Sequence, residues 1–211
     1  MDFSFVLRQK GYNDEMKIVQ VDDENLDFVV GEAVRALKKG KVLVCPTDTV
    51  YGLVADATNE EAVQRVFKIK GREKGKPLPV FVKDRKMAKQ FAHINISQTK
   101  FLKNNWPGKV TAVLESTHVL PKELELHGKI ALRIPDYELL NLLLKKVTRP
   151  LTGTSANVSG APSCSSAQEV IAQFKREKYK PDLLIDAGRL PKSKPSKVID
   201  ITGNRRKIIR N

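Results

Sequence analysis

The chain has 211 residues, 41% of them hydrophobic, and a formal net charge of +14 from 38 basic and 24 acidic residues. This length is enough to bury one sizeable core, so we expect a single domain that attracts polyanions such as nucleotides, RNA or an acidic protein. No apolar span of 18 residues and no signal-like start occurs, so we expect no membrane contact and a cytoplasmic protein.

Residues 1–15 are expected to form a flexible amino-terminal arm before a domain that spans 16–211. In the first half of this domain, apolar periodicity and turn residues predict alternating strands and helices. Asp23 is the expected cap of the first helix and Gly40 its stop. Strands are predicted at 17–21, 42–45 and 78–82, and helices at 23–39, 60–69, 86–91 and 98–104.

The second half continues the alternation, without an internal repeat. Strands are predicted at 110–114, 130–134, 151–154, 183–185, 197–201 and 207–209, and helices at 137–146 and 167–175. Interleaved elements of this kind predict an α/β domain, with a twisted mixed sheet and helices packed outside it.

A turn crowded with small oxygen-bearing side chains follows the strand at 42–45. Pro46 ends the strand, and Thr47, Asp48 and Thr49 come next. Open α/β sheets hold ligands at the ends of their strands, so this turn is a candidate binding site. The alternative is a turn whose hydroxyls satisfy only the local backbone.

A basic loop follows the helix at 60–69. It carries Lys70, Arg72 and Lys76, with Gly71 and Gly75 giving the backbone room to approach a ligand. The planar guanidinium of Arg72 suits phosphate or carboxylate, so a nucleoside triphosphate would fit this loop. The alternative is a solvated group of cations at a helix C-terminus.

A loop of Gly, Ser, Thr and Asn follows the strand at 151–154. Its exposed amides and hydroxyls can cradle phosphate, although an ordinary loop has the same composition. Neither the G-x-x-x-x-G-K-[ST] nor the G-x-G-x-x-G fingerprint of nucleotide-binding proteins occurs.

Taken together, the segments have a specific order. They are 46–53, 70–72, Trp106 to Thr111, Leu132 to Asp136, 155–160 and Pro195 to Asp200. This order resembles the YrdC-like family of threonylcarbamoyl-AMP synthases over roughly 29–210, and the family's Lys-x-Arg and Ser-x-Asn pairs match at Lys70 with Arg72 and at Ser155 with Asn157.

The resemblance implies a basic concave cavity and a nucleotidyltransferase without a permanently bound cofactor or a metal site of its own. Its substrates would be L-threonine, bicarbonate or CO2, and ATP with magnesium, and its products threonylcarbamoyl-AMP and pyrophosphate. A separate transferase complex would then modify the adenosine beside the anticodon of tRNA. Some longer relatives carry a second, C-terminal domain, which we do not expect here.

Site residues are carried over from the family by motif. Lys70 and Arg72 are the implied catalytic residues, and Arg133 adds a further cation to the cavity. The implied threonine-binding residues are Thr49, Gly153 and Ser196. The implied ATP-binding residues are Arg72, Lys76, Thr111, Ser155, Asn157, Ser163 and Arg210.

Two positions depart from familiar relatives. Lys76 stands where Asn is common, and Phe81 stands where His is common in some members. A further lysine beside a triphosphate is chemically compatible with the site.

The segment 188–196 contains Pro191 and Pro195 and is predicted to close over threonine, because Ser196 lies at its end. His93, His118 and His127 stand apart from all the motifs and are interpreted as surface or core residues.

Cys45 and Cys164 lack the spacing of a zinc site and are expected to be free thiols. The rival function is a double-stranded RNA-binding or tRNA-binding module without synthase activity, since the same basic surface could hold duplex RNA by shape. A weaker third reading is a carbamoyl-transfer domain like those within hydrogenase-maturation proteins.

Overall fold

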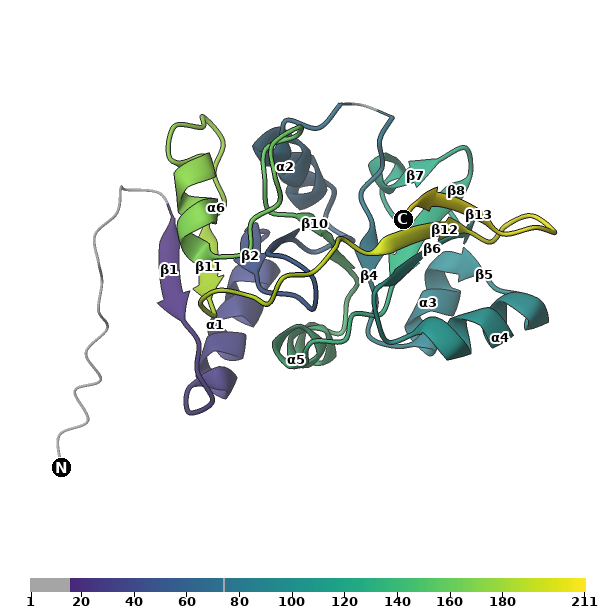
Figure 1. Cartoon of the computed structure of the whole chain (residues 1–211), viewed down its shortest axis with the longest axis horizontal. Coiled ribbons are helices and arrows are strands. Elements are labelled where there is room, and N and C mark those ends of the chain that lie inside the picture. The colour runs from purple at the N-terminus through teal and green to yellow at the C-terminus, as the bar shows by residue number, and fades with distance from the viewer. Residues whose placement is uncertain (1–15, 74) are drawn as a thin grey trace, which may run out of the picture.

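A computed structural model describes residues 16–73 and 75–211 and contains two β-sheets with helices packed around them (Figure 1). The first sheet has the strand order β1-β11-β2-β3-β10. Its strands are β1 (Lys17–Gln20), β11 (Leu183–Asp186), β2 (Leu43–Cys45), β3 (Gly52–Val54) and β10 (Thr154–Ser155).

The second sheet has the strand order β13-β12-β6-β8-β4-β9, with β5 paired to β6 and β7 paired to β8. Its strands are β13 (Lys207–Arg210), β12 (Lys197–Asp200), β6 (Val110–Ser116), β8 (Lys129–Arg133), β4 (Val80–Phe81), β9 (Leu151–Thr152), β5 (Ala92–His93) and β7 (Glu125–Leu126). Both sheets mix parallel and antiparallel pairs, as the sequence predicts.

Helices enclose the first sheet from both faces because its strand residues alternate between two cores. Leu43, Cys45 and Val54 pack in one core with α1 (Leu26–Lys38) and α5 (Glu138–Val147). Val44 and Leu53 pack in the other core, with α2 (Glu60–Lys70) and α6 (Ala167–Phe174). The fully apolar run at 42–45 is thus the signature of a strand that is buried on both faces.

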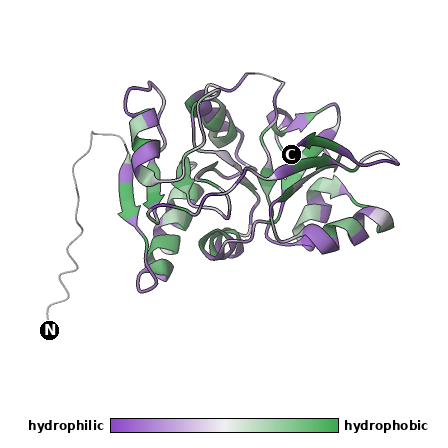
Figure 2. Ribbon diagram, viewed as in Figure 1, coloured by the Kyte–Doolittle hydropathy of each residue, from purple (hydrophilic) through white to green (hydrophobic). Residues whose placement is uncertain are grey.

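The second sheet packs in the same core as Val44 and Leu53. Ala112, Leu114, Ile130 and Leu132 are buried in it, together with residues of α3 (Arg85–Phe91) and α4 (Ile96–Asn105). The short 3-10 helix η1 (Lys122–Leu124) precedes β7. Figure 2 shows that the strands are largely hydrophobic, whereas hydrophilic residues lie on the outer surfaces of the helices. No helix within the described residues is long and apolar enough to cross a membrane.

The predicted elements are confirmed apart from a few local differences. The first helix begins at Leu26, and its N-cap is Asn25 rather than Asp23. The prediction of Asp23 as the cap is wrong because Asp22 accepts the N–H groups of Glu24 and Asn25 and holds this segment in a turn. The predicted strand at 151–154 is interrupted at Gly153 and contributes β9 to one sheet and β10 to the other.

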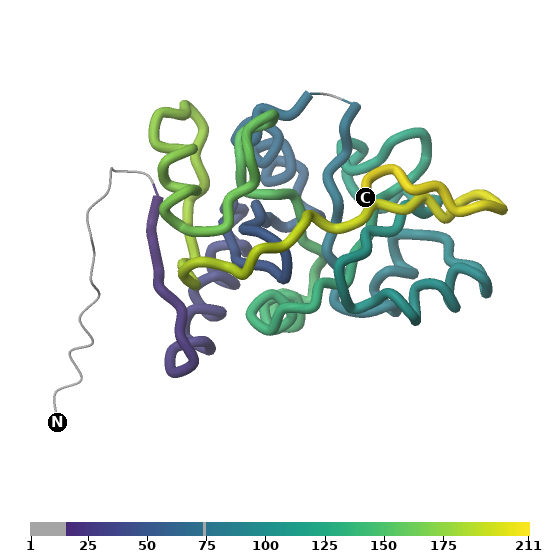
Figure 3. Tube along the Cα trace, viewed as in Figure 1, coloured from purple at the N-terminus to yellow at the C-terminus, as the bar shows by residue number. Residues whose placement is uncertain are grey.

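One connection runs from the first sheet to the second. Residues 187–196 lead from β11 to β12 and are named the strap here. In Figure 3 the yellow-green strap crosses between the two halves of the molecule. The predicted arm at 1–15 lies outside the described residues.

Candidate functional site

A cavity of about 590 Å³ is lined by residues of both sheets and of the loops between them. It gathers most of the side chains predicted from the sequence, namely Thr49, Arg72, Lys76, Arg133, Gly153, Ser155, Ser163, Ser196 and Arg210. A second cavity of about 440 Å³ is lined by Lys70 and Asn157 and shares Arg72, Lys76 and Ser155 with the first. Residues that are widely separated in the sequence, from Thr49 to Arg210, therefore line two adjoining cavities.

The turn after β2 is held together by Thr47. Its hydroxyl donates to the carbonyl of Val50 at 2.7 Å and accepts the N–H of Thr49 at 3.1 Å. The Thr49 hydroxyl lies 3.0 Å from that of Thr47. The Thr47 hydroxyl thus satisfies local backbone, as the second alternative expects, while Thr49 lies at the cavity wall, where its role in binding stays a prediction.

Lys70 is the last residue of α2, which Gly71 ends with a left-handed C-cap at φ 59°. The lysine is buried, and its ammonium donates to the carbonyls of Ser155 (2.8 Å) and Asn157 (3.1 Å) and to Asn157 Oδ1 (2.9 Å). Burial, and then the nearby charge of Arg72, lower the pKa of Lys70 to about 8. Lys70 therefore joins the Lys-x-Arg segment to the Ser-x-Asn segment through hydrogen bonds.

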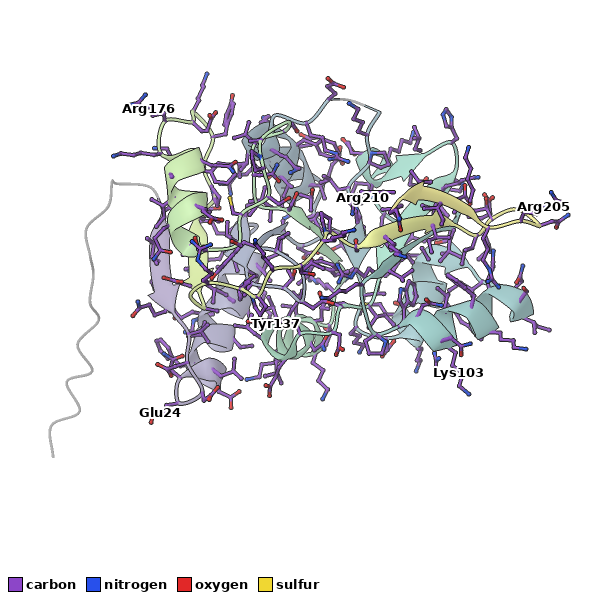
Figure 4. The ribbon with its side chains drawn as sticks, viewed as in Figure 1. Glu24, Lys103, Tyr137, Arg176, Arg205 and Arg210 are labelled. Carbon is purple, nitrogen blue, oxygen red and sulfur yellow. The ribbon has the colours of Figure 1, made fainter. Side chains whose placement is uncertain are left out.

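Arg72 and Arg210 bring two guanidinium groups to the same cavity from distant parts of the chain. Among the described residues, Arg72 donates to two main-chain carbonyls, those of Lys76 and Pro77. Its pKa is lowered by burial and then by the charge of Arg210. Figure 4 shows Arg210 near the middle of the molecule, with Arg176 and Arg205 at the periphery. Two mutually repelling cations favour an anion between them.

Ser196 is held at the end of the strap by Thr111 and Arg210. Its hydroxyl lies 2.9 Å from that of Thr111 on β6 and accepts from Arg210 at 3.2 Å, and Arg210 also donates to the Ser196 carbonyl at 2.8 Å. Thr111 is fully buried behind Ser196 and does not line the cavity. Its hydroxyl therefore positions Ser196 in this structure.

Gly153 separates β9 from β10 and lies against the ring of Phe81. Its N–H donates to the carbonyl of Pro79 at 2.7 Å, which holds the backbone at the cavity wall. Together with Thr49 and Ser196, these residues form a compact lining of hydroxyl, backbone and aromatic groups.

The chain is similar to known proteins in sequence and in fold. The family model Sua5_yciO_yrdC, described as "Telomere recombination", matches residues 35–211. The chain belongs to the Sua5/YciO/YrdC family. A putative threonylcarbamoyl-AMP synthase from Methanocaldococcus jannaschii is 34% identical over 90% of this chain and 88% of its own length.

Two solved structures extend the likeness to the fold. Sua5 from Pyrococcus abyssi complexed with L-threonine has a TM-score of 0.84 and 32% identity, covering 92% of this chain and 56% of that one. Escherichia coli YciO has a TM-score of 0.82 and 25% identity, covering 94% and 96%. This chain thus spans about half the length of Sua5 and nearly the whole of YciO.

Arg133 forms an ion pair with Asp48. Its guanidinium is buried and donates to both carboxylate oxygens of Asp48 at 2.6 Å, while its Nε donates to the Gly108 carbonyl. Asp48 comes from the turn between β2 and β3, so the ion pair joins the first sheet's turn to β8 of the second sheet. The carboxylate offsets the charge that the sequence suggested for substrate binding.

The cavity also contains residues that sequence reasoning missed. His127, interpreted from the sequence as a surface or core residue, is exposed and lines the cavity. It follows β7 and has a left-handed backbone conformation (φ 51°). Lys129 donates to Asp200 at 3.0 Å and to Thr202 at 2.7 Å across β8 and β12. A basic residue and an acidic residue 71 positions apart carry no sequence signal for such a pair. Lys76 pairs with Glu73 in solvent.

Proposed function

We propose that this chain is a threonylcarbamoyl-AMP synthase, a nucleotidyltransferase that joins L-threonine, bicarbonate or CO2, and ATP. The observation that carries the proposal is the convergence of Arg72 and Arg210 on the cavity that also contains Thr49, Gly153 and Ser196. Such a site presents cations for a polyanion beside hydroxyls and backbone for a small polar substrate.

The relatives support the same activity. Besides the archaeal relatives, proteins from Bacillus subtilis and Bos taurus named threonylcarbamoyl-AMP synthase are 33% and 36% identical over 72% and 65% of this chain. The relative YciO from Escherichia coli, at 28% identity, is named only as uncharacterized. An activity assay on this chain is therefore needed to decide whether it has the activity of the relatives named as synthases.

In the proposed reaction, the threonine nitrogen bonds to the carbon of bicarbonate or CO2 and gives a carbamate, with loss of water when bicarbonate enters. A carbamate oxygen then attacks the α-phosphorus of ATP. The bond from that phosphorus to the bridging oxygen breaks, and pyrophosphate leaves. Both partners of the second step are anions, so screening of their repulsion and precise placement are the main requirements.

The residues divide these tasks between them. Arg72 and Arg210, with Lys76, neutralise phosphate charge, while Ser155 and Ser163 donate hydroxyl hydrogen bonds to phosphate oxygens. Lys70 and Asn157 hold the Ser155 segment in place. Thr49, Gly153 and Ser196 hold threonine, and Thr111 sets the Ser196 hydroxyl.

Magnesium would enter with ATP and would offset the negative charge of the phosphates. The residues of the cavity suit a metal that arrives with ATP, because the carboxylate of Asp200 already accepts hydrogen bonds from Lys129 and Thr202. No group of three or more His, Cys, Asp or Glu side chains arranged for a metal occurs within 16–73 and 75–211.

Pyrophosphate release from ATP with magnesium and bicarbonate, with and without L-threonine, tests the proposal. We expect threonine-dependent release by the wild type, its loss in Arg72→Ala, and its retention in Arg176→Ala, an exposed arginine far from the cavity. Product analysis should show threonylcarbamoyl-AMP. No release under any condition, with duplex RNA still bound, would refute the synthase and favour the RNA-binding alternative. The product would be passed to a transferase complex that modifies tRNA.

A further inference from the structure

Tyr51 connects three of the segments that form the proposed substrate site. Tyr51 immediately precedes β3 in the chain, and its ring is fully buried. Its N–H donates to the carbonyl of Cys164 at 2.9 Å, and its own carbonyl accepts the N–H of Ala156 at 2.7 Å. Tyr51 thereby ties the turn that carries Thr49 to the loop that carries Ser155 and Ser163.

The phenol of Tyr51 reaches the third segment, the strap. Its hydroxyl donates to the carbonyl of Gly188 at 2.7 Å and accepts the N–H of Ala187 at 3.0 Å. Burial raises the pKa of this phenol, so the hydroxyl remains a neutral donor throughout the physiological pH range. A buried phenol needs partners in any protein, but here both partners are backbone groups of the segment that ends at Ser196.

The remaining contacts divide the strap into held and exposed parts. The N–H of Leu190 donates to the Ser165 carbonyl at 2.8 Å, and Leu190 is itself buried. Beyond it, residues 191, 192, 194 and 195 are exposed, and Lys109 donates to Ser193 at 2.9 Å. Ser196 is buried again at the cavity. Any closing motion is therefore centred on the exposed stretch, because the residues before it are held by Tyr51, by Ser165 and by the ion pair of Arg189 with Glu169.

We infer that Tyr51 is a positioning residue, whose hydroxyl anchors the strap and so sets Ser196 relative to Thr49. Thr49 lies two residues before Tyr51 in the same turn, and Ser196 lies eight residues after Gly188 in the strap. One buried side chain thus ties the start of the strap to the turn that carries Thr49, while Thr111 and Arg210 hold Ser196 at the strap's other end. This inference rests on the proposed function.

Tyr51→Phe tests the inference, because it removes the hydroxyl and keeps the ring. Loss of two hydrogen bonds predicts that KM for threonine rises about 5- to 100-fold, with KM for ATP much less affected. Tyr179→Phe is the matched control, since Tyr179 is 45% exposed and lies outside the site, and its kinetics should equal those of the wild type.

A double-mutant cycle distinguishes positioning from general loss of stability. If Tyr51 acts through the strap, Tyr51→Phe and Ser196→Ala should be non-additive in KM for threonine. Additive effects, or equal increases in KM for both substrates, would overturn the inference. If Tyr51→Phe does not fold, Leu190→Ala loosens the same strap and should show the same selectivity and non-additivity.

Amide hydrogen exchange without substrate separates this inference from the proposed function. Tyr51→Phe should speed exchange in 187–196 and leave the core helix α5 unchanged, even if the wild type releases no pyrophosphate. In that event the synthase proposal fails and the anchoring of the strap stands on the exchange result. Unchanged exchange in the strap would overturn the anchoring itself.

Discussion

The ring of Phe81 lies directly over the backbone of Gly153, so that a Cβ added there would fall 2.8 Å from two of the ring carbons. Phe81 is the last residue of β4, and Gly153 is the break between β9 and β10. The two residues form one wall of the cavity. The aromatic ring that departs from the more familiar histidine thus occupies the space that the absent side chain of Gly153 provides.

Gly153→Ala should therefore disturb both stability and the threonine side of the cavity. The ring must move, and overpacking of this kind costs about 1–3 kcal/mol of unfolding free energy. We also expect a higher KM for threonine. Chemical denaturation and steady-state kinetics measure the two effects.

Two variants control this prediction. Gly31→Ala lies in α1 with only Arg35 near its added methyl group, so it should not destabilise and can add up to about 1 kcal/mol. Phe81→Leu combined with Gly153→Ala should recover part of the lost stability. If Gly153→Ala is as stable as the wild type, the contact has no energetic weight.

Lys70 predicts a pH dependence of stability. Its pKa is about 8 in the folded chain and 10.5 in the unfolded one, so between these values the unfolded chain binds more protons. The free energy of unfolding should therefore rise as pH increases from about 8 towards 10.5, because the cost of burying the charged lysine disappears. Below pH 8 this cost is fully present.

The comparison with Lys70→Met isolates this effect from the other titrating lysines. The difference in unfolding free energy between wild type and variant should shift in favour of the wild type across that window, as measured by urea denaturation at several pH values. A difference that stays constant with pH would mean that the ammonium is not destabilised by burial.

The sequence predicts that the segments of the site lie close together, but it does not predict which hydrogen bonds join them. Thr49, Ser155 and Ser196 follow or precede predicted strands, and strand ends gather at sheet edges, so their convergence could be expected. The partners of Tyr51 could not be predicted, because they are backbone groups 136 and 137 residues away. Nearly every residue has the same backbone N–H and C=O groups, so a backbone partner cannot be recognised from residue type.

The partner of Arg133 could not be predicted from the sequence either. A cation in a Leu-Arg-Ile-Pro segment is equally compatible with a substrate contact and with an ion pair. Its partner Asp48 lies 85 residues earlier, in a turn that the sequence presents either as a binding site or as a turn that satisfies local backbone, and neither reading includes an ion pair with Arg133. The packing of β8 against that turn brings the two charges together, and whether Arg133 also contacts substrate stays a prediction.

The Asp48–Arg133 pair predicts a strong asymmetry between single and double variants. Asp48→Ala leaves a buried guanidinium without its carboxylate and should cost about 3–5 kcal/mol of unfolding free energy. Replacing both residues by leucine should cost less than that single change. Threonine-dependent pyrophosphate release by the folded double variant would show that the Arg133 charge is structural, whereas its loss would return Arg133 to the substrate-binding cations.

Arg72 predicts a separation of activity from stability. Arg72→Ala should lower kcat/KM for ATP by about 30-fold to a few thousand-fold, equivalent to roughly 2–5 kcal/mol for a desolvated charge contact. Stability should change little, because the variant loses hydrogen bonds to Lys76 and Pro77 but also relieves the repulsion between Arg72 and Arg210. Kinetics and urea denaturation on the same preparations, with Arg176→Ala as control, measure both quantities. A loss of stability large enough to account for the lost activity would contradict a role in substrate binding.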